Sequence, residues 1–388
     1  MTLSDILNQF GEEREHYYNA IAPPIIQSSN FSFPTVADFR NAIVQENVSH
    51  VYTRGNNPTV EILRKKLAAL EKTDDALVVS SGVTAMAVSI MSCVKQGDHI
   101  ICVENPYSWT KALCANYLPR FGVTTTFVDG REIANIEAAK QPNTTLLVLE
   151  SPNTFTYELQ DLRACADWAK RHSIVTIIDN SHASPIFQRP AEYGIDMVVH
   201  TITKYLNGHS DVVAGVVCGR QDLIDRIFFG EYMTLGTVIS PHDGAMILRG
   251  LRTLQLRMQR VQQTAMVMLD YLKKHPMIER VLYPMDLDFP QYSLARRQMS
   301  GSGGLMTVYL KAKEIKSIET FVDSLQRFQI AVSWGGHESL IIPIAAFYGL
   351  EGRTDPALPW NCVRFYFGLE EPEDLISDLE QGFMKMIE

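Results

Sequence analysis

Between residues 73 and 219 the sequence alternates short apolar runs with amphipathic segments, and this alternation constrains the fold more than any other feature. The apolar runs are rich in Val and Ile, whereas segments such as 161–172 (DLRACADWAKRH) have helical periodicity. Strands that are apolar along their whole length and alternate with helices form mostly parallel sheets with both faces covered. We therefore predict an α/β fold. The strand candidates are 75–81, 99–104, 125–130, 145–151, 174–179, 197–201 and 212–219.

Polar side chains end several of these predicted strands. In an open α/β sheet, ligands bind at the carboxyl ends of the strands, so this edge is where we expect the functional site. The polar residues at strand ends are Ser80, Ser81, Glu104, Glu150, Ser151, Asp179, Asn180, Thr201 and Thr203.

Composition and charge exclude several classes of partner. The 388 residues carry 35 Lys and Arg against 44 Asp and Glu, and the net charge of −9 argues against a nucleic-acid or anionic-membrane partner. The first residues contain acids and lack the basic start and apolar core of a signal peptide. No apolar run reaches the roughly 18 residues of a membrane span. The six cysteines form no C-x-x-C pair, so we predict reduced core thiols in a cytoplasmic protein.

The length and the order of segments predict two domains and an arm. Residues 1–55 are predicted to be an N-terminal arm, and residues 56–245 a large ligand-binding domain. A long helical stretch after Pro241 should link it to a smaller domain that mixes strands with helices. Residues 246–388 are therefore predicted to be a C-terminal α/β domain that includes the linking helix.

Three short motifs at strand ends carry the chemistry. The turn SSGVT at residues 80–84 can aim free N–H groups and a helix dipole at a single phosphate, whereas the G-x-G-x-x-G pattern of dinucleotide sites is absent. Asp179 can hold a protonated ring nitrogen, and Lys204 can form a Schiff base. Each residue alone is more often a structural turn, a solvated cap or a surface lysine. Together, and in this order, they match the requirements of pyridoxal phosphate. The histidines near Lys204 lack metal-ligand spacing, so no metal site is predicted.

With their flanks, these motifs resemble the Cys/Met-metabolism family of pyridoxal-phosphate enzymes, which includes cystathionine γ-synthase, cystathionine γ-lyase, cystathionine β-lyase and methionine γ-lyase. The likeness runs from about Ala22 to the C-terminus. It implies the fold type I, aspartate-aminotransferase-like architecture, with a mostly parallel large domain and a smaller C-terminal domain. TITKYLNGHSDVVAG resembles the family's cofactor-lysine segment, and SSGVTA and IDNSHASP resemble its phosphate turn and its ring-nitrogen segment. The implied cofactor-binding residues are Lys204, Gly82, Val83, Asp179, Ser181, Thr201 and Thr203.

The resemblance also implies a shared active site. Tyr107 in ENPYSWT corresponds to the tyrosine that stacks on the cofactor, and it could deprotonate the incoming amine or protonate a departing thiolate. Tyr52 and Arg54 in YTRGNNPT would bind the phosphate in a neighbouring subunit, which implies a homodimer, usually within a homotetramer. Arg364 in VRFYFGLE would hold the α-carboxylate of a small sulfur-containing amino acid, with Ser333 of SWGGHESL beside it.

Three departures from the family pattern concern the reaction. Thr154 stands where most members have an Asn, Trp334 resembles the tryptophan of β-lyases, and Val332 stands where γ-enzymes carry a glutamate. These residues are closest to a bacterial-type cystathionine β-lyase. We therefore expect a carbon–sulfur lyase that releases a thiol, pyruvate and ammonia from cystathionine or cysteine-type substrates, with Thr154 and Trp334 contacting the substrate. The alternatives are a methionine γ-lyase, a cystathionine γ-lyase or a γ-replacement enzyme and, more distantly, a non-catalytic scaffold of the same fold.

Overall fold

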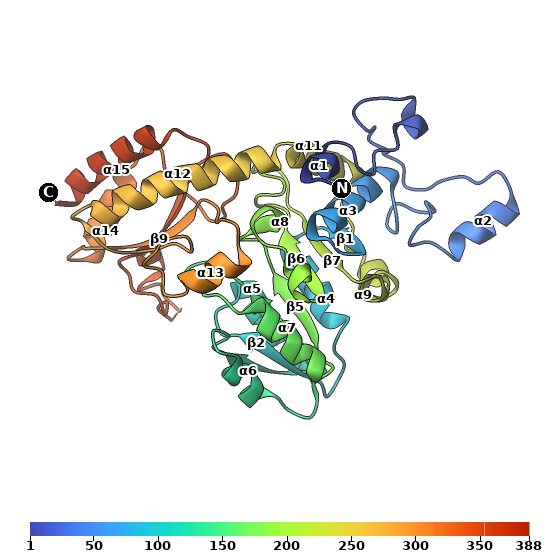
Figure 1. Ribbon diagram of the computed structural model, residues 1–388, viewed down its shortest axis with the longest axis horizontal. Helices are drawn as coiled ribbons and strands as arrows, with labels where there is room; N and C mark the ends of the chain where they lie inside the picture. The colour runs from blue at the N-terminus through green and yellow to red at the C-terminus, as the bar shows by residue number, and fades with distance from the viewer. Residues whose placement is uncertain (353, 388) are drawn as a thin grey trace.

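The computed structural model describes residues 1–352 and 354–387, and its larger sheet has seven strands in the order β1-β7-β6-β5-β4-β2-β3 (Figure 1). The four pairings among β2 to β6 are parallel, and β7 is antiparallel to both β1 and β6. The predicted α/β fold with a mostly parallel sheet is confirmed, with β7 as the antiparallel exception. The strands are β1 Asp75–Val79, β2 His99–Val103, β3 Thr124–Val128, β4 Thr144–Glu150, β5 Val175–Asp179, β6 Met197–Thr201 and β7 Gly215–Gly219.

Helices cover both faces of this sheet, which explains why its strands are apolar at consecutive positions. Val148 of β4 belongs to the buried cluster on the face of α4, whereas its neighbour Leu147 belongs to the cluster on the face of α7. Successive residues of a strand point to opposite faces, so both faces need apolar side chains. The helices of this region are α3 Pro58–Glu71, α4 Gly82–Met91, α5 Ser108–Ala112, α6 Ile133–Ala139, α7 Leu162–Arg171, α8 Ser184–Phe187, α9 Gln221–Ile227 and α10 Met233–Leu235.

The predicted linking helix is in fact two helices, α11 Pro241–Leu251 and α12 Leu254–Lys274. Near the break, a Cβ on Gly250 would lie 2.3 Å from the backbone oxygen of Asn207, so only glycine fits here. Helix α12 extends from the large sheet across the C-terminal region (Figure 1).

The second sheet has five strands in the order β10-β11-β12-β9-β8, and α14 and α15 pack together beside it. Its strands confirm the predicted mixture of strands and helices in the C-terminal region; the exact domain boundaries stay a prediction. The elements are β8 Ile278–Leu282, α13 Tyr292–Gln298, β9 Leu305–Leu310, α14 Ile315–Ser324, β10 Gln329–Ile330, β11 Leu340–Pro343, β12 Cys362–Tyr366 and α15 Pro372–Ile387.

The N-terminal segment is partly docked and partly extended. Helix α1, Leu3–Asn8, packs on α3, and the buried carboxylate of Glu12 binds Lys66 at 3.0 Å and Arg252 at 3.0 Å. The following chain, with α2 at Val36–Ile43, projects away from the body of the molecule (Figure 1). The assignment of residues 1–55 as an arm stays a prediction.

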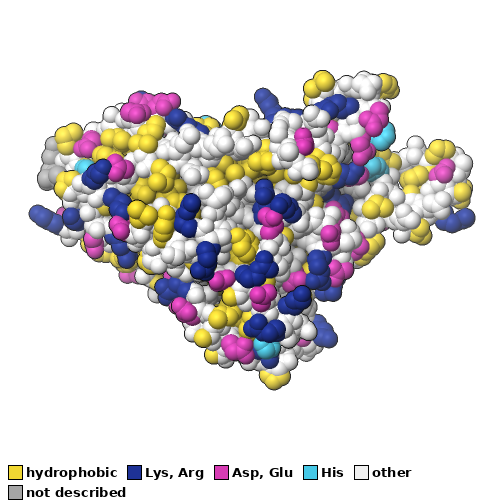
Figure 2. All heavy atoms as spheres, viewed as in Figure 1, with side chains coloured by type: hydrophobic (Ala, Val, Ile, Leu, Met, Phe, Trp, Pro, Cys, Tyr) yellow, Lys and Arg dark blue, Asp and Glu magenta, His cyan; other side chains and the backbone are white. Residues whose placement is uncertain are grey.

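Charged side chains of both signs are interspersed over the face drawn in Figure 2. Among the described residues, no helix combines the length and the apolar character that crossing a membrane requires.

Candidate active site

Lys204 follows the carboxyl end of β6, and its ammonium group donates a hydrogen bond to Ser333 Oγ. The same group lies 5.3 Å from the ring centroid of Trp334. Burial, reinforced by the positive charge of Arg364 and opposed by Asp179, lowers the pKa of Lys204 to about 8. An amine with this pKa is partly deprotonated near neutral pH, as a nucleophile or base must be.

The start of α4 forms the predicted phosphate turn beside the end of β6. Ser81 caps the helix by accepting the Thr84 N–H at 3.0 Å, and the other first-turn N–H groups lack intrahelical partners. A Cβ built on Gly82 would lie 2.0 Å from Thr201 Oγ1, so glycine is required for this close approach. The turn therefore presents backbone N–H groups of Gly82 and Val83 next to the Thr201 hydroxyl, a donor set suited to a phosphate.

Asp179 ends β5 and is tied to β6 through Ser181. Its Oδ1 accepts the Ser181 N–H at 2.9 Å, and the Ser181 hydroxyl accepts the Thr201 N–H at 2.6 Å. Burial raises the pKa of Asp179, while the bonds from Ser181 lower it. The Thr203 hydroxyl donates to the Ala214 carbonyl at 3.2 Å and accepts the Ala214 N–H at 3.0 Å, and its role in phosphate binding stays a prediction.

Arg364 is 5% exposed on β12, in the second sheet, and faces the large-domain site. Its Nη1 donates to Thr154 Oγ1 at 3.0 Å, its Nη2 donates to the Ser333 carbonyl at 3.3 Å, and its guanidinium lies 4.7 Å from the Phe155 ring centroid. Ser333 has a φ of +85°, in the left-handed region that is costly for a residue other than glycine. This conformation lets one residue contact both Arg364 and Lys204.

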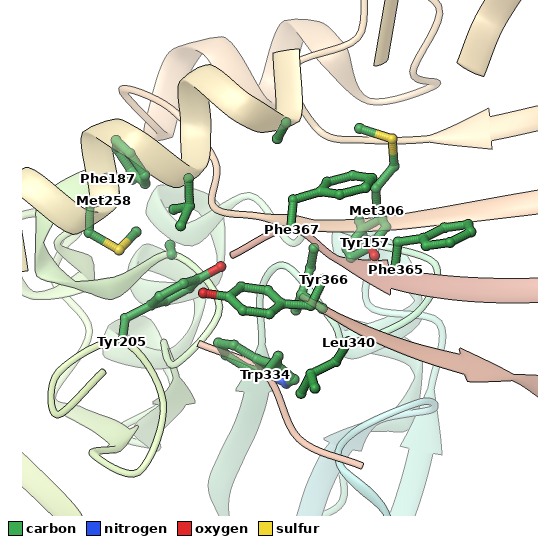
Figure 3. Close-up of a cluster of buried hydrophobic side chains, with 14 of the residues drawn as sticks. Tyr157, Phe187, Tyr205, Met258, Met306, Trp334, Leu340, Phe365, Tyr366 and Phe367 are labelled. Atoms are coloured by element: carbon green, nitrogen blue, oxygen red, sulfur yellow. The ribbon is translucent and has the colours of Figure 1, made fainter. Parts of the chain in front are cut away.

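A buried aromatic cluster joins the two segments that carry these cations (Figure 3). The ring of Tyr205, next to Lys204 in sequence, lies 5.2 Å from Trp334 and 6.1 Å from Tyr366. Tyr366 is two residues from Arg364, and its hydroxyl donates to the Gly336 carbonyl at 2.7 Å. The cluster therefore fixes the backbone around Lys204 and Arg364 relative to each other.

Tyr107 precedes α5 and is 41% exposed. Its backbone N–H donates to Glu150 Oε2 at 2.5 Å. Glu150 and Phe155 were not among the predicted site residues, although Glu150 was visible in the sequence as a polar end to an apolar strand. No sequence pattern pointed to Phe155, because its contact is with Arg364, which is far away in the sequence.

Tyr52 and Arg54 are placed differently from the other predicted residues. The Arg54 guanidinium lies 5.5 Å from the Tyr52 ring centroid, and Tyr52 is 44% exposed. No hydrogen bond or ring contact within the described chain joins either residue to Lys204 or Asp179. Their predicted role in a neighbouring subunit stays a prediction.

The assembled groups fit pyridoxal phosphate. The glycine turn beside Thr201 provides room and donors for a phosphate, Asp179 is a buried carboxyl group for a ring nitrogen, and Lys204 is an amine of lowered pKa for an aldehyde. When bound, the cofactor would be held by these groups, with Tyr107 free to cover the ring.

Comparisons with known proteins agree with this fit. The sequence profile of the Cys/Met metabolism PLP-dependent enzyme family matches residues 6–384. L-methionine gamma-lyase of Pseudomonas deceptionensis is 40% identical over 97% of this chain and 98% of its own length, and that of Pseudomonas putida is 36% identical over 96% and 94%. The crystal structure of cystathionine gamma synthase from Xanthomonas oryzae pv. oryzae superposes with a TM-score of 0.92 at 31% identity, covering 100% of this chain and 99% of that one. These matches cover nearly the whole chain, and the groups at the site fit pyridoxal phosphate. This protein therefore belongs to the Cys/Met metabolism family of pyridoxal-phosphate-dependent enzymes.

Proposed function

We propose that the protein is a carbon–sulfur lyase that removes the sulfur substituent from the γ-carbon of a methionine-type amino acid. The observation that carries the proposal is the 40% identity, along 97% of the chain, to an L-methionine gamma-lyase. This favours the γ-enzyme alternative over the β-lyase that Thr154, Val332 and Trp334 suggested.

The surroundings of Arg364 support a substrate with one carboxylate and an apolar tail. Arg364 binds the carboxylate, since its planar guanidinium suits bidentate contacts. Phe155 packs on the Arg364 guanidinium, and Val332 precedes Ser333, which contacts Arg364. Neither residue offers a charge to a second ammonium or carboxylate, so a thioether such as methionine suits the site better than cystathionine.

Bound pyridoxal phosphate supplies an aldehyde for the substrate's amine and an electron-withdrawing ring that acidifies the Cα–H bond. Lys204, with a pKa of about 8, takes the Cα proton. Loss of a γ-substituent also requires removal of a proton from Cβ, and the same amine is suited to that transfer. The balance is methionine plus water giving methanethiol, 2-oxobutanoate and ammonia.

Tyr107 is suited to protonate the departing thiolate. Burial, with the nearby carboxyl groups of Asp179 and Glu150, raises the pKa of Tyr107 above its usual value. A phenol with a raised pKa keeps its proton at neutral pH, which favours the donor role over that of a base.

The projecting arm supports an assembly in which subunits share sites. Tyr52 and Arg54 follow the α2 region, which extends away from the subunit's own body (Figure 1). In a homodimer they would reach the phosphate of the neighbouring site, and the cofactor site would be incomplete without the second copy.

β-Elimination is the second candidate, and Trp334 favours it. Its indole, 5.3 Å from the Lys204 ammonium group, narrows the space beside the base, which suits a shorter reacting chain. Identification of the oxo acid separates the two reactions. γ-Elimination from methionine gives 2-oxobutanoate, whereas β-elimination from cystathionine or cysteine gives pyruvate. If cystathionine and cysteine yield pyruvate while methionine yields no product, the proposal is wrong.

A further inference from the structure

Glu150 lies at the centre of the site although none of the steps above uses it. It is the last residue of β4, is 7% exposed, and pairs in register with Asp179, the last residue of β5. Residues in register on neighbouring strands point to the same face and lie about 5 Å apart. The two carboxyl groups are therefore buried side by side at the carboxyl ends of the interior strands β4 and β5.

Two buried carboxyl groups at this distance do not both ionise readily, because each charge disfavours the other. Burial, followed by the charge of Asp179, raises the pKa of Glu150 well above its usual range. Backbone N–H groups favour the charged form of Glu150, whereas Asp179 has the Ser181 N–H at 2.9 Å and also the positive charge of Lys204. The proton of the pair therefore belongs on Glu150 and the charge on Asp179.

Glu150 lies against the backbone of two other parts of the site. Its Oε2 accepts the backbone N–H of Tyr107 at 2.5 Å, and the nearby backbone of Thr154 lowers the pKa of the same carboxyl group. No side chain caps α5 at Tyr107, so the bond to Glu150 holds the backbone where the tyrosine ring begins. Thr154 in turn accepts a bond from Arg364 at 3.0 Å.

We propose that Glu150 is a positioning residue of the cofactor site. As an uncharged carboxylic acid it accepts the backbone N–H of Tyr107, and it leaves the negative charge of the Glu150–Asp179 pair on Asp179. It thereby holds the backbone of the residue that covers the cofactor ring beside the carboxylate that meets the ring nitrogen. The inference rests on the proposed roles of Asp179 and Tyr107.

Infrared spectroscopy of the holoenzyme tests the charge of Glu150 directly. A difference spectrum between the wild-type protein and Glu150→Gln at pH 7 should contain the C=O band of one protonated carboxyl group. Asp378→Asn is the matched control: Asp378 is also buried and accepts backbone N–H groups, of Gln326 and Arg327 at 2.9 and 2.7 Å, but lies on α15. The C=O band of protonated Glu150 should still be present in Asp378→Asn. If the difference spectrum between wild type and Glu150→Gln lacks this band, the proposal is overturned.

Cofactor affinity tests the positioning role without recourse to turnover. Glu150→Leu keeps the volume but has no acceptor, so the Kd for pyridoxal phosphate should rise about tenfold. Glu150→Gln restores an uncharged acceptor and should recover most of that loss. Equal affinity of wild type and Glu150→Leu, or equal losses in both variants, would contradict the positioning role. If Glu150→Leu does not fold, the infrared result on Glu150→Gln decides.

Asp179→Ala separates this inference from the proposed function. If Asp179→Ala leaves pyridoxal phosphate affinity unchanged, the assignment of the cofactor site itself is wrong. If it weakens binding while Glu150→Leu does not, the site stands and only the role of Glu150 falls.

Discussion

Arg364 and Thr154 are 210 residues apart in sequence, yet Arg364 Nη1 donates a 3.0 Å hydrogen bond to Thr154 Oγ1. The contact joins β12 of the second sheet to the segment that follows β4 of the first. It holds the buried guanidinium of Arg364 close enough to Lys204 to affect the pKa of that lysine. The site proposed for the substrate's α-carboxylate thus depends on how the two sheets pack against each other.

Arg364→Lys should weaken the use of amino-acid substrates. Lysine keeps the charge but loses the planar fork, and it cannot bind Thr154, Ser333 and a carboxylate together. We expect kcat/KM to fall about 100-fold, corresponding to roughly 3 kcal/mol, mainly through KM. Steady-state kinetics with methionine measure the effect. An unchanged KM would exclude Arg364 as the carboxylate ligand.

Lys204→Ala should abolish turnover, because it removes the proposed nucleophile and base. In the wild-type protein, borohydride should fix pyridoxal phosphate covalently to Lys204, and mass spectrometry of the tryptic peptide would locate it. The variant should bind the cofactor reversibly and show no adduct. Turnover by the variant above background would contradict the assignment.

The reaction of the cofactor-free protein with pyridoxal phosphate should depend on pH through Lys204. Its pKa is lowered to about 8, so the free amine becomes available as pH rises through about 8. The initial rate of adduct formation should rise with a midpoint near that value. Arg364→Gln removes a positive charge that lowers this pKa, and should move the midpoint upward. A wild-type midpoint near that of an ordinary lysine would show that the amine is not desolvated.

Gly82→Ala should impair cofactor binding by displacing the turn at the start of α4. The added Cβ would meet Thr201 Oγ1 at 2.0 Å and push the turn away from the strand. We expect the Kd for pyridoxal phosphate to rise at least about tenfold, measured by absorbance titration. Gly244→Ala is the control, since Gly244 lies in α11 and its Cβ would make an ordinary 3.4 Å contact with Val60 of α3. Equal affinities in the two variants would argue against a phosphate turn at Gly82.

Glu12→Gln should lower the melting temperature of the protein. Glu12 is 1% exposed and neutralises the equally buried Lys66, so the substitution leaves a buried cation without its counter-charge. Breaking a buried pair from one side costs about 3 to 5 kcal/mol. Glu13→Gln, which removes a half-exposed partner of Lys65, should cost under about 1 kcal/mol. Thermal unfolding of the two variants compares them directly, and equal melting temperatures would contradict the role of the buried network.

Local patterns were sufficient to predict the large sheet and to bring its polar strand ends to one edge. The period of the apolar residues reports whether one or both faces of a strand are buried, and the residues at strand ends must meet at one edge of a parallel sheet. Lys204, Asp179 and the turn at Gly82 could therefore be identified from the sequence, and the flanking motifs added Tyr107 and Arg364 by resemblance.

Tertiary structure decided what local periodicity cannot express. The break between α11 and α12 lies near Gly250, which packs against Asn207. The left-handed Ser333 is held by contacts from distant segments. The sequence alone marked Glu150 as a polar strand end. Strand order and register place Glu150 beside Asp179, and a hydrogen bond joins it to the Tyr107 backbone. The sequence could not predict its protonation, because that depends on which charges and N–H groups lie beside the carboxyl group in space.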